Sequence, residues 1–143
     1  MPFFIKWPNK IPANTKTNQL TCLTDFTATI ADLLNIKLDD HTAEDSYSVL
    51  PTLLNEESVE RGPVIHHSSL GRFAVRHKEW VLAFCPFSGG WEDKKMKKEE
   101  LNKMPRLQLY NIKGDVSQQK NVYDKHPDSD NLTYPRQFAL NED

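Results

Sequence analysis

The spacing of apolar residues changes along this chain from helical steps to the short alternating runs of strands. In residues 23–36, apolar side chains recur every three or four positions, which predicts a helix with one apolar face. Thr24 or Asp25 is suited to cap the start of this helix, and Asn35 to end it. The apolar positions are Leu23, Phe26, Ile30, Leu33 and Leu34.

Two short segments complete the first part of the chain. Residues 2–8, PFFIKWP, form an aromatic-rich run between prolines, a pattern typical of a buried strand. No comparable run pairs with it, so it predicts the last strand of a sheet whose other strands lie outside this sequence. Residues 47–54, YSVLPTLL, predict a short second helix that tolerates Pro51 only in its first turn.

From Pro63 onward the sequence predicts an antiparallel sheet. PVIHH, GRFAVR and WVLAF are short runs rich in β-branched and aromatic residues, and HKE between the last two has the length of a hairpin turn. A fourth run, RLQLYNI, follows a long polar loop with a possible helical turn. We therefore expect an α+β fold with a four-stranded antiparallel sheet and flanking helices, divided into residues 1–60 and 61–143.

Composition and charge exclude only a few classes of protein. Hydrophobic residues make up 38% of the 143, and the five glycines still leave the total below the ~45–50% usual for globular domains, so the core is thin. A net charge of −2 predicts neither a protein that binds nucleic acid nor a basic protein that binds membrane surfaces. No apolar run approaches the ~20 residues of a membrane span, and the first residues do not form a secretory signal.

No residue set in the chain predicts a metal site or a catalytic centre. The histidines and cysteines lack the spacing of a zinc site. His66 and His67 are adjacent on a predicted strand, so their side chains face opposite sides and cannot both bind one metal ion. No Gly-x-Ser-x-Gly elbow occurs, and we expect Cys22 and Cys85 to be free thiols. The residues whose side chains could bind such a metal ion are His66, His67, His77, Cys85 and His126.

The order of these pieces resembles the type I sulfatase family. PFFIKWPNKIP is similar to that family's Pro-Phe-(apolar)₂-(Lys/Arg)-Trp-Pro-Gly segment, with Asn9 in place of glycine. TCLTDFTATIADLLNIKL resembles the helix that follows, and EDSYSVLPTLL resembles Asp-Gly/Ser-x-Ser-x-Leu-Pro-x-Leu. HHSSLGRFAVRHKEWVLAF and QLYNIKGDVSQQKNVYDKHPD are similar to later family segments, so the resemblance extends from Pro2 to Asp128.

The resemblance implies a C-terminal portion of an arylsulfatase-like sulfuric ester hydrolase. Residues 1–60 would then be the last strand and helix of an alkaline-phosphatase-like α/β domain, and residues 61–143 the C-terminal antiparallel-sheet subdomain. The implied partner is the N-terminal catalytic domain of the same parent protein, with a sulfated substrate in the complete enzyme. The family is commonly exported or lysosomal, and the sequence does not assign a compartment.

The family's catalytic chemistry is not expected in this chain. Type I sulfatases use a formylglycine matured from Cys/Ser-x-Pro-x-Arg, together with a calcium ion. Cys22 is followed by LTDF and Cys85 by PFSG, so neither matches the motif. We therefore expect no catalytic residue, no metal ligand and no cofactor in this chain, and no sulfatase activity from it alone.

The resemblance suggests a role for the segment HHSSLGR at the rim of the substrate pocket. His67, His66 and Arg72 are the candidate substrate-binding residues, because an imidazole or a guanidinium can bind a sugar hydroxyl or a sulfate oxygen. His67 is favoured over His66 because it lies nearer the loop. The alternative is that both histidines only pack within the sheet.

The sequence also allows two other interpretations of the chain. The chain could be a stand-alone binding or regulatory module that pairs with a separately encoded sulfatase large domain, and Met1 directly before Pro2 favours this alternative. It could also be a remnant without a function. A cooperative unfolding transition of the monomer would support the stand-alone module.

Overall fold

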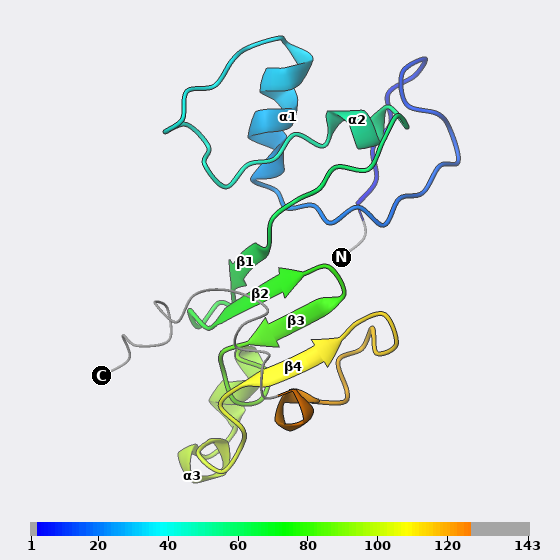
Figure 1. Ribbon diagram of the computed structural model, residues 1–143. Helices are drawn as coiled ribbons and strands as arrows, with labels where there is room; N and C mark the ends of the chain where they lie inside the picture. The colour runs from blue at the N-terminus through cyan, green and yellow to red at the C-terminus, as the bar shows by residue number, and fades with distance from the viewer. Residues whose placement is uncertain (1–2, 127–143) are drawn as a thin grey trace. The chain divides into compact units, whose positions relative to one another are not determined.

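The computed structural model describes residues 3–126 and divides the chain into two compact units between Arg61 and Gly62. The first unit contains α1 (Asp25–Leu33) and α2 (Leu50–Leu53), which lie side by side in the upper part of Figure 1. The second unit contains the sheet, formed by β1 (Val64–His67), β2 (Phe73–His77), β3 (Trp80–Ala83) and β4 (Gln108–Asn111).

The predicted helix between residues 23 and 36 is confirmed as α1. It begins at Asp25 and ends at Leu33, and the left-handed Asn35, whose φ is 55°, follows two residues later. The amide of Ile36 donates to the carbonyl of Ala31 at 2.8 Å, so an otherwise unpaired helix carbonyl is satisfied. The short second helix is also confirmed, with Pro51 in the first turn of α2, where its missing amide hydrogen costs nothing.

The strand expected over residues 2–8 is not formed among the described residues of that segment. Residues 3–7 lie outside any strand, and the Phe4 side chain is 88% exposed. A strand needs a hydrogen-bonded neighbour, and the sheet that the structure describes within residues 3–126 does not include this segment. Asn9, which stands where the resemblance has glycine, adopts a φ of 65°, in the left-handed region that asparagine enters more readily than most residues.

The sheet is an antiparallel meander in the order β1-β2-β3-β4, as the sequence predicts. His77 pairs with Trp80, so only Lys78 and Glu79 form the turn between β2 and β3. Lys78 has a φ of 52°, a conformation that such tight hairpin turns require of at least one residue.

The core of the second unit lies on both faces of β3 and β4. Val75, Leu82 and Leu109 are buried in register on one face, because cross-strand partners share a face. Val81 and Tyr110 are buried as partners on the other face.

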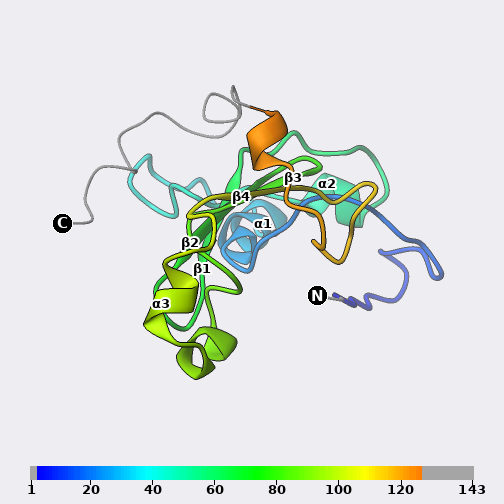
Figure 2. The ribbon, with the colours of Figure 1, turned by 90° about the horizontal axis from the view of Figure 1, so that it is seen from below.

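The long polar loop after β3 contains the predicted helical turn. It forms η1 (Trp91–Lys95) and α3 (Lys98–Leu101), which project from one end of the sheet in Figure 2. After β4, η2 (Tyr123–Lys125) returns to the sheet, and the amide of Val122 donates to the carbonyl of Leu109 at 2.9 Å. Within residues 3–126, no helix has the length and apolarity needed to cross a membrane.

Candidate functional site

Ser68 organises the loop between β1 and β2, which contains Arg72 and directly follows His66 and His67 at the end of β1. Its backbone amide donates to the carbonyl of Arg72 at 2.9 Å. Its hydroxyl accepts the amides of Leu70 at 3.2 Å and of Arg72 at 3.3 Å, and donates to the carbonyl of Gly89. These bonds close residues 68–72 into a tight turn and attach it to the loop that follows β3.

Two glycines with left-handed backbone serve this turn differently. Gly71 has a φ of 74°, and a Cβ atom placed on it would meet nothing within 4 Å. Gly89 has a φ of 64°, and a Cβ atom there would lie 2.6 Å from Cys85 Sγ and 3.2 Å from Arg72 Cβ. The absent side chain of Gly89 therefore leaves the space through which the stem of Arg72 passes.

His67 is the last residue of β1, and its exposed side chain has contacts at the Nδ1 side of the ring and with one aromatic neighbour. Its Nδ1 atom is 2.9 Å from the carbonyl oxygen of Ser68, and its ring meets Phe73 edge-on at 5.9 Å. A carbonyl oxygen only accepts hydrogen bonds, so Nδ1 carries the hydrogen. In the neutral ring, Nε2 is then the acceptor, and in the protonated ring it becomes a donor.

His66 lies on the opposite face of the sheet from His67. It pairs with Ala74, whereas His67 pairs with Phe73. Arg72 precedes Ala74 by two residues and so shares its face, which is the face of His66. The structure thus groups Arg72 with His66 and places the favoured candidate, His67, on the other side of the sheet.

The electrostatics around Arg72 involve the buried thiol of Cys85. Burial, reinforced by the negative charge of Asp93, raises the pKa of Cys85, while the positive charge of Arg72 opposes this rise. Cys85 therefore remains a neutral thiol at physiological pH, and Arg72 supplies the positive charge next to the loop.

This arrangement can bind but offers no nucleophile activated for catalysis. Arg72 can bind an anionic oxygen, and each histidine can bind a hydroxyl or an anion according to its protonation. Cys22 and Cys85 are both free thiols. Across the described part of the chain, no group of three or more His, Cys, Asp or Glu side chains is placed to hold a metal ion.

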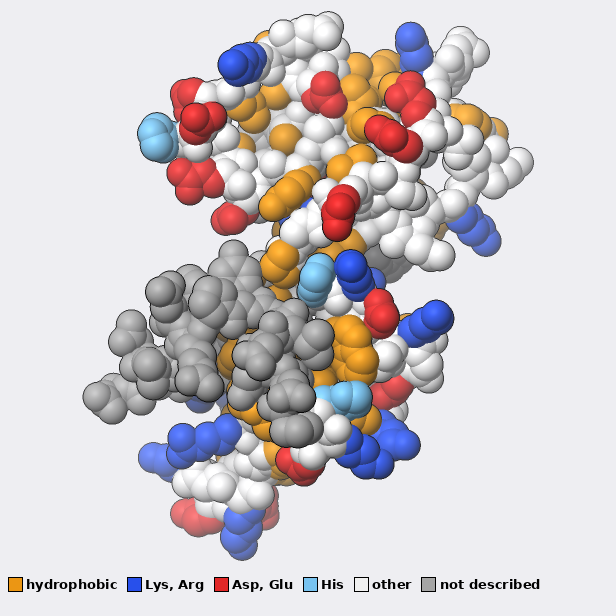
Figure 3. All heavy atoms as spheres, viewed as in Figure 1, with side chains coloured by type: hydrophobic (Ala, Val, Ile, Leu, Met, Phe, Trp, Pro, Cys, Tyr) orange, Lys and Arg blue, Asp and Glu red, His pale blue; other side chains and the backbone are white. Residues whose placement is uncertain are grey.

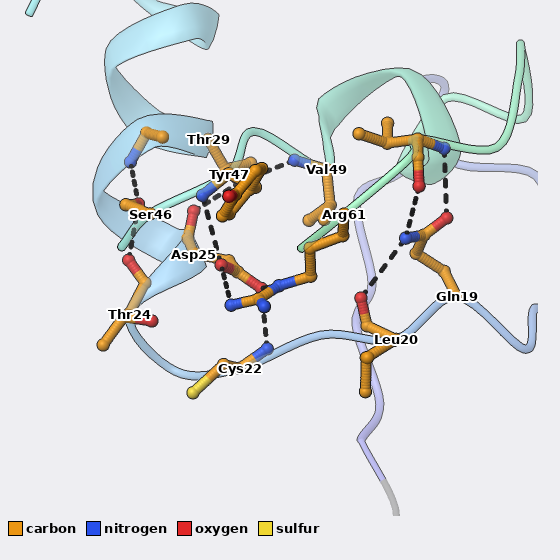
Figure 4. A network of polar contacts seen from close by, with 12 residues as sticks. Gln19, Leu20, Cys22, Thr24, Asp25, Thr29, Ser46, Tyr47, Val49 and Arg61 are labelled. Carbon is orange, nitrogen blue, oxygen red and sulfur yellow. Dashed lines mark hydrogen bonds and ion pairs between the residues drawn. The ribbon is translucent and has the colours of Figure 1, made fainter. Parts of the chain in front are cut away.

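Among the described residues, the most elaborate polar cluster lies in the first unit, and it was not predicted from the sequence. Asp25 is 1% exposed, and its two carboxylate oxygens accept the Nε and Nη2 hydrogens of Arg61, each at 2.9 Å (Figure 4). The same oxygens accept the backbone amides of Cys22 at 2.7 Å and of Tyr47 at 3.2 Å. The Arg61 guanidinium also lies over the Tyr47 ring, 4.9 Å from its centre.

A second layer of hydrogen bonds extends this cluster along α1. Thr29 donates from its hydroxyl to the carbonyl of Asp25 at 2.7 Å and accepts the amide of Val49 at 3.1 Å. Ser46 donates to the carbonyl of Thr24 and accepts the amide of Ala28 (Figure 4). Asp25 and Thr29 are polar positions in the segment that resembles the sulfatase helix, and this resemblance was the available signal for the cluster.

The cluster shifts the titration of two of its members. Burial acts to raise the pKa of Asp25, but the hydrogen bonds from Arg61 and from the amides of Cys22 and Tyr47 outweigh it and hold the pKa below its ordinary value. For Cys22, partial burial acts upward, and hydrogen bonds from Thr24 lower the pKa of the thiol overall. The Asp25 carboxylate is therefore charged at neutral pH and forms a true ion pair with Arg61.

One curated protein matches most of the chain, while no protein-family model matches it. The N-acetylgalactosamine-6-O-sulfatase of Bacteroides thetaiotaomicron is 29% identical over 131 residues. The match covers 90% of this chain and 24% of that protein. The chain thus spans about a quarter of the length of its relative.

Solved structures share the fold. BT33336S-sulf, from work on the metabolism of multiple glycosaminoglycans by Bacteroides thetaiotaomicron, aligns over 76% of this chain and 22% of its own, with a TM-score of 0.58 at 24% identity. Ps i-CgsB aligns over 85% of this chain and 24% of its own, with a TM-score of 0.59 at 21% identity. A second structure of Ps i-CgsB contains k-i-k-neocarrahexaose.

Proposed function

Since the predicted resemblance to the sulfatases is confirmed over most of this chain, we propose that it works as part of a sulfuric ester hydrolase and contributes the rim of the substrate pocket. The identity to a carbohydrate sulfatase over 90% of the chain carries the proposal. A relative named for N-acetylgalactosamine 6-O-sulfate favours a sulfated saccharide as the substrate class.

In this proposal Arg72 binds the sulfate group, and the histidines bind sugar hydroxyls. The turn at Ser68 fixes the backbone of Arg72, and the space above Gly89 accommodates its stem. His66 shares the face of Arg72, so these two can contact one sugar unit, while His67 would contact a group on the other side of the strand.

The chain is expected to be catalytically silent by itself, because neither cysteine lies in the formylglycine motif. The assay combines the purified full chain with calcium and an aryl sulfate. We expect no turnover above buffer, and turnover that persists after contaminating sulfatases are removed would contradict this part of the proposal.

The rim function is tested by titrating the ¹⁵N-labelled full chain with N-acetylgalactosamine 6-sulfate and with the unsulfated sugar. We expect amide shifts at residues 66–72 with the sulfated sugar, and weaker shifts without sulfate. Arg72→Ala should abolish them and Arg72→Lys should retain part. Arg106→Ala is the matched control, since Arg106 is also exposed and precedes β4. Shifts that survive Arg72→Ala would overturn the rim function.

A further inference from the structure

The Trp91 side chain is exposed at the start of η1. Its exposed fraction is 71%, and the ammonium group of Lys94 lies over its ring, 4.9 Å from the ring centre. A ligand that covers such a ring gains free energy, because a large apolar area leaves water. Lys94 keeps a positive charge beside the same ring, so the pair offers an apolar surface and a cation together.

The backbone on both sides of Trp91 is fixed by side chains. Ser88 Oγ accepts the amide of Gly90 at 3.2 Å and donates to the carboxylate of Asp93 at 2.7 Å. The amide of Asp93 donates to the carbonyl of Gly90 at 3.1 Å, and Gln108 on β4 donates to a carbonyl of the same loop at 2.6 Å. The indole therefore belongs to a loop of defined conformation, which lowers the cost of ordering it around a ligand.

The same loop contacts Arg72, the residue proposed to bind sulfate. Ser68 donates from its hydroxyl to the carbonyl of Gly89, and a Cβ atom on Gly89 would lie 3.2 Å from Arg72 Cβ. Trp91 follows Gly89 by two residues, which span at most about 7 Å of chain. Trp91 and Arg72 therefore lie at the same end of the sheet, where η1 and α3 project in Figure 2, and one oligosaccharide can contact both.

Basic side chains are more frequent at this end than in the whole chain. Residues 91–106 contain five lysines and one arginine against four acidic residues, whereas the chain has a net charge of −2. Two of the acidic residues already have partners, since Glu92 pairs with Lys95 at 2.7 Å and Asp93 accepts from Ser88. Figure 3 shows Lys and Arg side chains, in blue, around the lower end of the view, where α3 lies in Figure 1. The charge here favours an anionic ligand.

We propose that Trp91 and Lys94 form a contact site for a sulfated sugar unit, next to the unit bound by Arg72. The inference rests on the proposed function and adds to the rim a stacking residue that selects among saccharides. A sugar ring has a face of C–H groups that packs on an indole, and a sulfate ester pairs with an ammonium group. A ligand with both properties uses the whole site, whereas an inorganic anion or a neutral sugar uses only part of it.

Titration of the ¹⁵N-labelled full chain with a hexasaccharide of chondroitin 6-sulfate, and with the same hexasaccharide without sulfate, tests the site. We expect the Trp91 indole N–H signal, assigned by its loss in Trp91→Phe, to shift with the sulfated hexasaccharide. Trp91→Ala should weaken binding at least fivefold, and Trp91→Phe should retain part of it. Lys94→Gln should weaken binding of the sulfated hexasaccharide more than that of the unsulfated one. An unshifted Trp91 signal, or full affinity in Trp91→Ala, overturns the proposal.

Phe4→Ala and Lys113→Gln are the matched controls. Phe4 is an exposed aromatic residue of the first unit, and Lys113 is an exposed lysine that follows β4 at the opposite end of the sheet from Gln108. Neither substitution should change the affinity, and circular dichroism of every variant checks that the sheet persists.

Two other ligands would contradict the proposal. Poly-glutamate that binds as tightly as the sulfated hexasaccharide, both unaffected by Trp91→Ala, would assign this end of the sheet to charge alone. Phosphatidylserine vesicles that bind through Trp91, with no binding of the hexasaccharide, would assign it to a membrane surface.

The outcomes also separate this site from the role of Arg72. A Trp91 signal that shifts with the sulfated hexasaccharide, while Arg72→Ala leaves the affinity unchanged, would retain the Trp91 site and refute the role of Arg72. Binding that Arg72→Ala abolishes, while Trp91→Ala and Lys94→Gln leave it unchanged, would retain the rim and refute the Trp91 site.

Discussion

The two units of this chain are centred on opposite kinds of side chain. Among the described residues, the largest side chains below 2% exposure are Asp25 in the first unit and Leu109 in the second. Asp25 is surrounded by directed hydrogen bonds from Arg61 and from backbone amides, whereas Leu109 pairs with Leu82 across β3 and β4 among apolar neighbours. The first unit is thus centred on directed hydrogen bonds, and the second on the packing of apolar side chains.

The difference shows what each kind of centre provides. An apolar centre stabilises through area removed from water, and it tolerates small shifts of its members. A buried ion pair gives little net stability compared with an apolar replacement, but it becomes very costly when one partner is lost. The first unit therefore depends on a few directed contacts, while several large apolar side chains of α1, among them Ile30 and Leu33, remain exposed.

The largest expected effect comes from removing the carboxylate of Asp25. Asp25→Ala removes the carboxylate that forms the ion pair with the buried Arg61 guanidinium, and we expect the free energy of unfolding of the first unit to fall by about 3–5 kcal/mol. Amide hydrogen exchange should then rise throughout α1 and stay unchanged in β3 and β4. Asp40→Ala, in an exposed loop of the same unit, is the control and should change exchange little. Protection of α1 that survives Asp25→Ala would contradict a polar centre.

Leu109→Ala should increase hydrogen exchange in the second unit and not in the first. The truncation leaves a cavity in the second unit, which costs about 2–5 kcal/mol for a buried leucine. We expect faster exchange in β3 and β4, with α1 unaffected, and a lower urea midpoint for the sheet. Val116→Ala truncates an exposed apolar side chain and should change the free energy of unfolding by less than about 0.5 kcal/mol. Equal effects of the two substitutions would refute an apolar centre at Leu109.

The two left-handed glycines sharpen the comparison within the second unit. Gly89→Ala places a methyl group against Cys85 and Arg72 and should cost about 1–3 kcal/mol from overpacking, in addition to backbone strain. Gly71→Ala carries only the strain of the left-handed backbone, roughly 1–2 kcal/mol, because nothing lies near its Cβ position. Thermal unfolding of both variants measures the difference, and a smaller loss for Gly89→Ala would exclude the close contact.

Acid should weaken the first unit before the second. The pKa of Asp25 is lower in the folded chain than its ordinary value of about 4, so its contribution is present above that value and is lost as the pH falls through the folded pKa. We expect hydrogen exchange in α1 to accelerate below about pH 4, corrected for intrinsic rates, with β3 and β4 less affected. The same acceleration in Asp25→Asn would assign the effect to other carboxylates.

The sequence predicted the second unit well, because its signals are local. Alternation in GRFAVR and its hairpin-sized separation from the apolar run WVLAF were sufficient to predict the pairing of β2 with β3. The helical period of residues 23–36 likewise predicted α1, and Asn35 predicted its end.

The rest depended on contacts between distant residues. The Asp25–Arg61 pair joins positions 36 apart, and no local pattern announces it. The strand expected at residues 2–8 was predicted from an apolar run between prolines, but strand formation requires a hydrogen-bonded neighbour, and none is present for residues 3–7 in the described part of the chain. The proposed roles of His66, His67 and Arg72 came from resemblance, and the register of β1 agrees with the prediction that the two histidines face opposite sides.

The span of the Asp25–Arg61 contact also has a consequence for the order of events during folding. The β2–β3 hairpin closes over two residues, and α1 forms within its own turns, so both can arise within microseconds. The ion pair must first close a long loop, and until Arg61 arrives, the carboxylate remains hydrated. We expect the fluorescence of Tyr47, beneath the guanidinium, to lag behind the helical signal in stopped-flow refolding. Simultaneous signals would mean that the first unit assembles in one step.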